Sequence, residues 1–364
     1  MSKTKKQQTA KKPSTKKSVN EASINYCGIP IATPRTFDST VNAERASFII
    51  ANDKYWANGT DLKFYFMGGT NLQKETVRKA FKRWKNVGIG ITFTEVDIAE
   101  TSHIRISFDP NDSNGTWWSY VGRDILDIRL QEKTMNLGGN FNSDYAYTAT
   151  LHEIGHTLGL KHEHQNPNSG IEWDKDKVYS YFQTSNGWNT SKVDSNILNK
   201  INNVTGSAWD KLSIMHYSFP SGLILKPSEL NKTGISINWD LSPNDIKWVK
   251  STYPGKNIEV LKDIASYKPE FVTAPAGSQD TFVFKPEYSS KYQIMTHGNM
   301  DSVVVVFQEV GNGVEYLSGD DNSGTPNGST IELRLLKGVT YRIAVRVMFR
   351  ERTDNTILLV IPTS

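Results

Sequence analysis

Four of the seven histidines in this 364-residue chain lie within thirteen consecutive positions. Two of them, His152 and His156, are four residues apart, so on a helix they lie one turn from each other on the same face and can bind one cation. Glu153 directly follows the first of these histidines, within reach of a metal-bound water. This spacing predicts a metal site that carries out hydrolysis; a polar cluster on a helix is the simpler alternative.

A glycine and another histidine extend the pattern to HExxHxxGxxH. Gly159 should end the helix, because glycine tolerates the left-handed backbone conformation, and the turn can bring back His162 as a third ligand. Three neutral histidines leave one position of a tetrahedral zinc open, as in a catalytic site. Zinc lowers the pKa of its bound water from ~15.7 toward ~7. Glu153 would then act as the general base while this water attacks a peptide carbonyl, so the pattern predicts peptide hydrolysis.

Composition restricts the classes of protein that remain. The single cysteine, Cys27, excludes an intramolecular disulfide framework and a cysteine-based zinc cluster. Seven lysines and one glutamate give residues 1–24 a net charge of +6, which leaves −2 for the rest of a +4 chain. We therefore expect residues 1–24 to form a disordered Lys-rich tail, and we expect no nucleic-acid partner.

Export and membrane signals are weak in this sequence. The Lys-rich start is not followed by the apolar stretch of a Sec signal peptide, so we expect none, and localisation stays open. No apolar run approaches the roughly 18 residues needed to cross a bilayer, so we expect no transmembrane segment.

The elements that must position the histidines follow from hydrophobic spacing. Residues 62–66 alternate as a strand, and residues 74–88 have the spacing of an amphipathic helix. The pattern predicts two more short strands, at residues 89–96 and 103–109, before the histidine helix. Residues 113–147 are rich in glycine and aromatic side chains, which favours loops and an edge strand bordering a cleft.

The chain divides into four predicted regions. Residues 25–54 are extended and pro-like after the tail, because proline disfavours helix at the residue before it. A helix capped by Ser242 closes a domain of residues 55–255. Beyond that, short strands recur every 10 to 15 residues with turn clusters between them, which predicts a small β-sandwich over residues 256–364.

The stretch HEIGHTLGLKHEH, together with SIMHY at residues 213–217, resembles the metzincin zinc endopeptidases and looks most like the astacin-type peptidases. WSYVG, NPNSGIEWD and LSPNDIKWVKSTYPG are also similar to that family, so the resemblance covers roughly residues 55–255. It implies an α+β zincin fold, with a twisted mixed sheet packed on long helices, an active-site helix and a Met-turn. Because this chain cannot form the disulfides of secreted animal astacins, it looks like a cysteine-poor bacterial or microbial relative. The residues implied at the zinc site are His152, His156, His162, Glu153 and Gly159.

The same resemblance implies roles for two residues of the SIMHY stretch. Met215 matches the methionine of the Met-turn, an apolar floor beneath the metal. Tyr217 matches the tyrosine that in astacin-like enzymes can ligate zinc and swing to support the oxyanion; a tyrosine that only packs near the Met-turn is the alternative.

The resemblance implies a zinc-dependent metalloendopeptidase with one catalytic zinc ion, acting on protein or peptide substrates. The alternative is a metal-containing binding or adhesion module without turnover, which would require Glu153 or a ligand to be compromised. The sequence indicates neither the cleavage specificity nor the oligomeric state.

The C-terminal strands resemble the pre-peptidase C-terminal β-sandwich of bacterial secreted proteases. Within them, SGDDNSG offers Asp320 and Asp321 as calcium ligands, and an ordinary polar turn is the alternative.

Cys27 has two interpretations that the sequence leaves open. The stretch YCGIP resembles the cysteine-switch segment of matrix-type metzincins, in which an inhibitory thiolate occupies the fourth zinc position until the pro-segment is cut. The alternative is a free cysteine packed as a small hydrophobic residue, because the flanking Arg and Asp of the switch pattern are absent.

Overall fold

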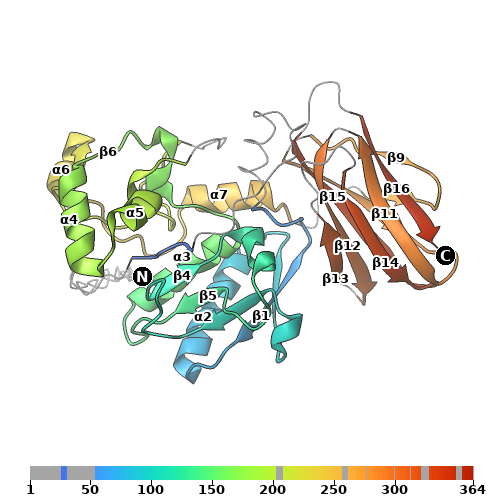
Figure 1. The fold of residues 1–364 in the computed structure, drawn as a ribbon, viewed down its shortest axis with the longest axis horizontal. Helices are drawn as coiled ribbons and strands as arrows, with labels where there is room; N and C mark the ends of the chain where they lie inside the picture. The colour runs from blue at the N-terminus through green and yellow to red at the C-terminus, as the bar shows by residue number, and fades with distance from the viewer. Residues whose placement is uncertain are drawn as a thin grey trace, which may run out of the picture.

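The computed structural model has an α+β part, coloured blue to yellow, beside an all-β part in orange and red (Figure 1). The predicted Lys-rich tail and most of the predicted extended segment 25–54 lie outside the described residues. Within the described part of the chain, no helix is long and apolar enough to cross a bilayer. The residues that the structure describes are 26–30, 54–201, 208–255, 261–275, 277–298, 300–311, 313–320, 328–349 and 355–363.

A five-stranded mixed sheet forms the base of the α+β part. Its strand order is β2-β1-β3-β5-β4, with parallel pairing except between β4 and β5. The predicted strand alternation is confirmed, because Leu62, Phe64 and Phe66 all face the core. The aromatic-rich region supplies β4 at the sheet edge. The strand bounds are β1 Asp61–Phe66, β2 Thr92–Glu95, β3 Ile104–Ser107, β4 Trp117–Ser119 and β5 Met135–Leu137.

Two helices, α2 (Asn71–Lys85) and α3 (Tyr145–Thr157), pack on this sheet and on each other. Thr70 caps α2 with a capping box, and the predicted amphipathic face buries Val77, Ala80, Phe81 and Trp84. The α3 helix carries His152 and His156, and every residue from Thr148 to Thr157 is buried. Two short 3₁₀ helices join the strands, η2 Ala99–Thr101 and η3 Gly122–Asp127.

After α3 the chain forms the second half of the α+β part, which has its own aromatic-rich core. Short elements dominate it, together with two longer helices, α4 and α7, and α7 lies beside α3 (Figure 1). The elements are η4 Glu163–Gln165, η5 Pro167–Ser169, β6 Glu172–Trp173, α4 Lys175–Asn186, α5 Thr190–Val193, η6 Asp194–Leu198, β7 Ile224–Lys226, α6 Ser228–Thr233 and α7 Pro243–Thr252.

The C-terminal part is a sandwich of two sheets, ordered β13-β12-β15-β10-β8 and β14-β11-β16-β9, around a separate hydrophobic core. The predicted α+β class with an all-β region behind it is thereby confirmed. The strands are β8 Leu261–Ile264, β9 Glu270–Phe271, β10 Gln279–Phe284, β11 Ser290–Gly298, β12 Asp301–Val310, β13 Gly313–Asp320, β14 Thr330–Leu335, β15 Tyr341–Phe349 and β16 Thr356–Thr363.

The predicted position of one turn in this region was wrong, because a strand extends into its first residues. Residues 318–320 were expected in a polar turn, but they end β13, because that strand pairs with β12 as far as Asp320. Asp321 lies outside the described residues, so the predicted calcium site stays a prediction. The domain division at residues 255 and 256 also stays a prediction, since residues 256–260 are not described.

The α7 helix is tied to the chain in front of it through Asp245. This buried carboxylate accepts hydrogen bonds from Ser213 Oγ (2.6 Å) and from the backbone N–H groups of Ile214 (2.8 Å) and Ser242 (2.8 Å). Ser242 in turn caps α7, as the sequence predicted. The carboxylate therefore fixes the backbone that leads into the predicted Met-turn.

We expect Asp245→Ala to lower the free energy of unfolding by about 3 kcal/mol, because it leaves two buried N–H groups without acceptors. Asp245→Asn is the matched control, since its amide oxygen can still accept from both N–H groups. Urea denaturation of the two variants measures the difference. An Asp245→Ala protein within about 0.5 kcal/mol of wild type would contradict this role.

Candidate metal centre

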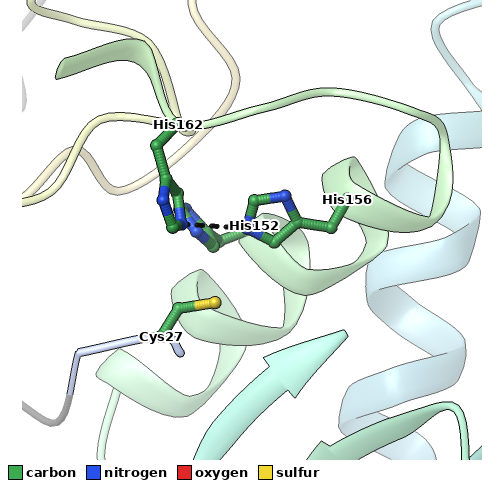
Figure 2. A group of neighbouring side chains, drawn as sticks. All are labelled: Cys27, His152, His156 and His162. Carbon is green, nitrogen blue, oxygen red and sulfur yellow. Dashed lines mark hydrogen bonds between the residues drawn. The ribbon is translucent and has the colours of Figure 1, made fainter. Parts of the chain in front are cut away.

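Three imidazoles and one thiol meet in a buried group next to α3. One ring nitrogen each from His152, His156 and His162, and Sγ of Cys27, all lie within 4.8 Å of one another. Figure 2 shows two of the rings on the helix, the third on the chain that returns after it, and Cys27 beside them. All four residues are buried. The structure thus brings together the three predicted ligands, and Cys27 lies with them.

Backbone carbonyls orient two of the rings. Nδ1 of His152 lies 2.8 Å from the carbonyl oxygen of Ile214, and Nδ1 of His156 lies 2.8 Å from that of Leu160. Because a carbonyl only accepts, each Nδ1 carries the proton and each Nε2 presents a lone pair. Nε2 of His156 and of His162 are 3.1 Å apart, close to the ~3.3 Å between two nitrogens on a tetrahedral zinc with bonds of ~2.0–2.1 Å.

Burial keeps these rings in the form that binds metal. It lowers the pKa of His152 to about 4, and it lowers the pKa of His156 and of His162 well below the ordinary value. Neighbouring imidazoles act in the same direction on the last two. A neutral imidazole has the free lone pair that a metal requires.

Gly159 makes the turn that brings the third ring back. The helix ends at Thr157, and Gly159 follows with φ of +92°, a conformation that disfavours other residues. A Cβ at this position would lie 2.7 Å from Cδ1 of Tyr55, so the turn also packs closely. The sequence-based expectation that the helix stops at this glycine is confirmed.

Met215 packs against α3, the helix that carries His152 and His156, and its role as the floor of the site stays a prediction. A Cβ on Gly155 of α3 would lie 2.4 Å from Sδ of Met215, so the thioether fills the space that a glycine leaves on the helix. The carbonyl of Met215 accepts from the N–H of Glu163, the residue after His162. The side chain and the backbone of Met215 thus contact both segments that carry the histidines.

Glu153 and Tyr217 approach the cluster from either side of Cys27. The thiol donates to Oε2 of Glu153 at 3.3 Å, and the hydroxyl of Tyr217 donates to the carbonyl of Cys27. Desolvation by burial raises the pKa of Glu153 to about 8 and raises that of Tyr217 well above its ordinary value. Both predicted catalytic side chains therefore contact one residue beside the histidines.

The segment that carries Cys27 lies along the edge of the mixed sheet. The N–H of Gly28 donates to the carbonyl of Trp117 on edge strand β4 (3.2 Å), and the N–H of Ile29 donates to Oδ1 of Asn196 (3.0 Å). The ring of Tyr26 packs against that of Tyr217, with centroids 5.3 Å apart. A cavity of about 40 Å³ remains beside this segment.

Two residues that position this group, Asp245 and Asn196, are not among the predicted site residues. Asn196 holds the Cys27 segment, and its carbonyl contacts Nε2 of His164, the fourth histidine of the cluster, at 2.8 Å. His164 is not among the grouped ligand atoms. No local signal reveals such partners, because each lies tens of residues from the group that it contacts.

Comparison with known proteins gives a family match over most of the α+β part. The model of the astacin peptidase family matches residues 48–253. A solved structure of myroilysin is 33% identical, with a TM-score of 0.51, and the match covers 56% of this chain and 97% of that one.

Two further solved structures are more distant. High choriolytic enzyme 1, a hatching-enzyme zinc protease from the medaka fish Oryzias latipes, is 16% identical with a TM-score of 0.40, covering 57% of this chain and 97% of that one. The pre-peptidase C-terminal domain of a collagenase from Bacillus anthracis is 15% identical with a TM-score of 0.23, covering 29% of this chain and 99% of that one.

We expect Gly159→Ala to lose bound metal, because alanine opposes the positive φ and its Cβ meets Tyr55, which displaces the turn before His162. Gly187→Ala is the matched control: this glycine also has positive φ, at +67°, but nothing lies within 4 Å of the added Cβ. Both changes should cost about 1–2 kcal/mol in backbone strain. Metal analysis of the purified proteins should show substoichiometric zinc only for Gly159→Ala; full occupancy there would contradict the role of the turn.

Proposed function

We propose, for a chain that belongs to the astacin family of zinc metalloendopeptidases, that His152, His156 and His162 hold the catalytic zinc and that Glu153 is the general base of peptide-bond hydrolysis. The observation that carries this proposal is the convergence of these four side chains with Cys27 in one buried group.

The donor set fits zinc. Nε2 of His152 is buried without a hydrogen-bond partner, which is costly unless a ligand occupies that direction. Nitrogen and sulfur donors in tetrahedral reach of one another suit zinc better than magnesium or calcium, which prefer oxygen. When bound, zinc supplies Lewis-acid polarisation of a carbonyl and a lower pKa for coordinated water.

The chain's own groups account for the proton transfers. Oε1 of Glu153 is buried and has no hydrogen-bond partner, so it can accept a proton from an attacking water and later deliver it to the leaving amine. The hydroxyl of Tyr217 already donates to a peptide carbonyl, that of Cys27, which is the contact that would support a developing oxyanion. With the base and all three predicted ligands in place, nothing favours the alternative of a binding module without turnover.

A protein or peptide substrate fits the edge of the sheet. Strand β4 is the edge strand, and its Trp117 carbonyl already accepts a backbone hydrogen bond from Gly28. An extended peptide can add to such an edge through backbone bonds alone. We therefore propose that substrates bind as extended chains along β4, with the scissile bond at the position of Cys27.

We expect Glu153→Gln to reduce kcat by about 10²–10⁴-fold while zinc stays bound, because glutamine keeps the shape of the side chain but cannot take the proton. His152→Ala is the contrasting variant, since it should lose both zinc and activity. Cleavage of a quenched peptide library, before and after chelation, measures the effect in chains whose N-terminal segment has been removed. Substantial turnover by Glu153→Gln would refute the mechanism.

We further propose that Cys27 holds the full-length chain inactive as the fourth ligand of the metal. Its sulfur lies with the three ring nitrogens, and it also fills the space between the cluster and Glu153, where an attacking water must stand. A soft thiolate suits zinc. A cysteine that was only a packed hydrophobic residue would not need its sulfur within 4.8 Å of a ring nitrogen of each of three histidines.

We expect full-length Cys27→Ala and Cys27→Ser to be active where the full-length wild type is not. The gain should exceed about tenfold, which corresponds to roughly 1.4 kcal/mol of lost inhibitory binding. Wild type cut after residue 30 is the control, because it should reach the activity of the variants. Equal activity of full-length wild type and Cys27→Ala would contradict the proposed inhibition and favour a cysteine that only packs as a small hydrophobic residue.

A further inference from the structure

The C-terminal end of α3 lies directly before the turn to His162, and two side chains donate to the carbonyls of Thr157 and Leu158 there. A helix leaves its final carbonyl groups without intrahelical donors. Here Nε1 of Trp56 donates to the carbonyl of Thr157 (2.7 Å), and the hydroxyl of Tyr253 donates to that of Leu158 (2.7 Å). These two side chains therefore fix the end of the helix that carries His156.

The two capping residues are joined to each other although they lie far apart in the chain. Trp56 precedes the first strand and Tyr253 follows α7, yet the N–H of Trp56 donates to the Tyr253 hydroxyl at 3.2 Å. The same hydroxyl thus accepts from one neighbour and donates to the other. Displacement of either residue would free a carbonyl at the end of α3.

Arg346, on β15 of the C-terminal sandwich, contacts both capping residues. Its Nη1 donates to the carbonyl of Trp56 (3.1 Å) and to that of Thr252 (3.3 Å) at the end of α7. Its guanidinium carbon lies 5.8 Å from the ring centroid of Tyr253 and 5.6 Å from that of Tyr55. Arg346 is only 4% exposed, so its charge lies against carbonyl oxygens and aromatic faces.

Other contacts of the sandwich hold the same short segment. The carboxamide of Gln279 accepts from the N–H of Asn58 (2.8 Å) and donates to its carbonyl (3.1 Å). Ala57 packs into a small apolar cluster with Val303, Val305, Phe307 and Ala344 of the sandwich. The segment from Trp56 to Asn58 is therefore bound to the sandwich through its backbone and to α3 through the Trp56 indole.

We infer that Arg346 is a positioning residue of the peptidase: by holding Trp56 and Tyr253 against the end of α3, the C-terminal sandwich fixes the helix terminus from which His156 and His162 are presented. The inference rests on the proposed metal site. It makes the sandwich an integral part of the catalytic unit rather than a separately attached binding module. A buried guanidinium is costly unless its partners are well placed, so its position here specifies one docking geometry.

The test compares full-length Arg346→Met, Arg346→Lys and Glu315→Gln. Glu315 forms an ion pair with Lys63 between the same two parts of the molecule, but neither residue contacts α3 in that pair, so Glu315→Gln is the matched control. Hydrogen exchange of the Gly159 and Leu160 amides, which bond to carbonyls at the end of α3, reports the helix terminus. Competition with a fluorescent chelator reports zinc affinity.

We expect Arg346→Met to weaken zinc binding by up to about tenfold, the lower limit of the effect of losing a direct partner of a metal ligand, because Arg346 acts through Trp56 and Tyr253. Exchange at both amides should become faster. Arg346→Lys should recover part of each effect, and Glu315→Gln should match wild type. In chains without the N-terminal segment, kcat should fall for Arg346→Met with KM unchanged, because Arg346 lies away from the substrate edge. Unchanged exchange and zinc affinity in folded Arg346→Met, or equal changes in Glu315→Gln, would overturn the inference.

A second variant keeps the test decisive if Arg346→Met does not fold. Trp56→Phe keeps an aromatic ring but removes the indole N–H that caps Thr157, so it should also weaken zinc binding. In the double variant with Arg346→Lys, the combined fold-change should be smaller than the product of the single ones, because both act through the same contact. Independent, multiplying effects would contradict the inference. Amide exchange and zinc binding can be measured without turnover. A chain that fails to cleave peptides would therefore refute the proposed function, but it would leave the role of Arg346 to be decided by these two measurements.

Discussion

Three imidazoles buried in one small volume are stable only while each ring is neutral, and the orientation of two of them depends on backbone carbonyls that accept from Nδ1. The acceptors for two of the rings are the backbone carbonyls of Ile214 and Leu160, neither of which belongs to α3. The helix supplies the spacing of His152 and His156, but two loops supply their orientation. The metal centre is therefore only as rigid as the backbone that surrounds the helix.

That backbone is held from distant parts of the chain. Asp245 on α7 fixes the segment that ends in the Ile214 carbonyl, and Trp56 fixes the end of α3 just before the turn to His162. Arg346 connects the second of these to the C-terminal sandwich. Each contact is a hydrogen bond in a buried setting, where an unmatched partner costs more than the bond itself contributes. Loss of any one of these hydrogen bonds is therefore costly, and this cost favours the complete set of contacts.

In the proposed scheme, the inhibitory segment that carries Cys27 makes the same contacts that a substrate would make. The Cys27 carbonyl receives the Tyr217 hydroxyl, its thiol reaches Glu153, and the neighbouring Gly28 N–H pairs with edge strand β4. A substrate would use the same edge, the same tyrosine and the same carboxylate. The segment can therefore block the cleft with substrate-like contacts, and a thiol in place of a hydrolysable bond at the metal would make the bound state unproductive.

The sequence by itself determined the chemistry of the site. The three proposed ligands, the proposed base and Gly159 lie within eleven consecutive positions, and helix periodicity with one left-handed turn is enough to bring them together. Periodicity likewise predicted β1, α2, β2 and β3, but it did not predict the helix α4 (Lys175–Asn186) or the strand β13 (Gly313–Asp320). Only the tertiary structure decided which distant groups complete the site: it placed Cys27 among the histidines and Arg346 against Trp56, across separations of more than 100 residues. Local spacing is encoded by neighbouring residues, whereas such contacts depend on how whole elements pack, which no short pattern records.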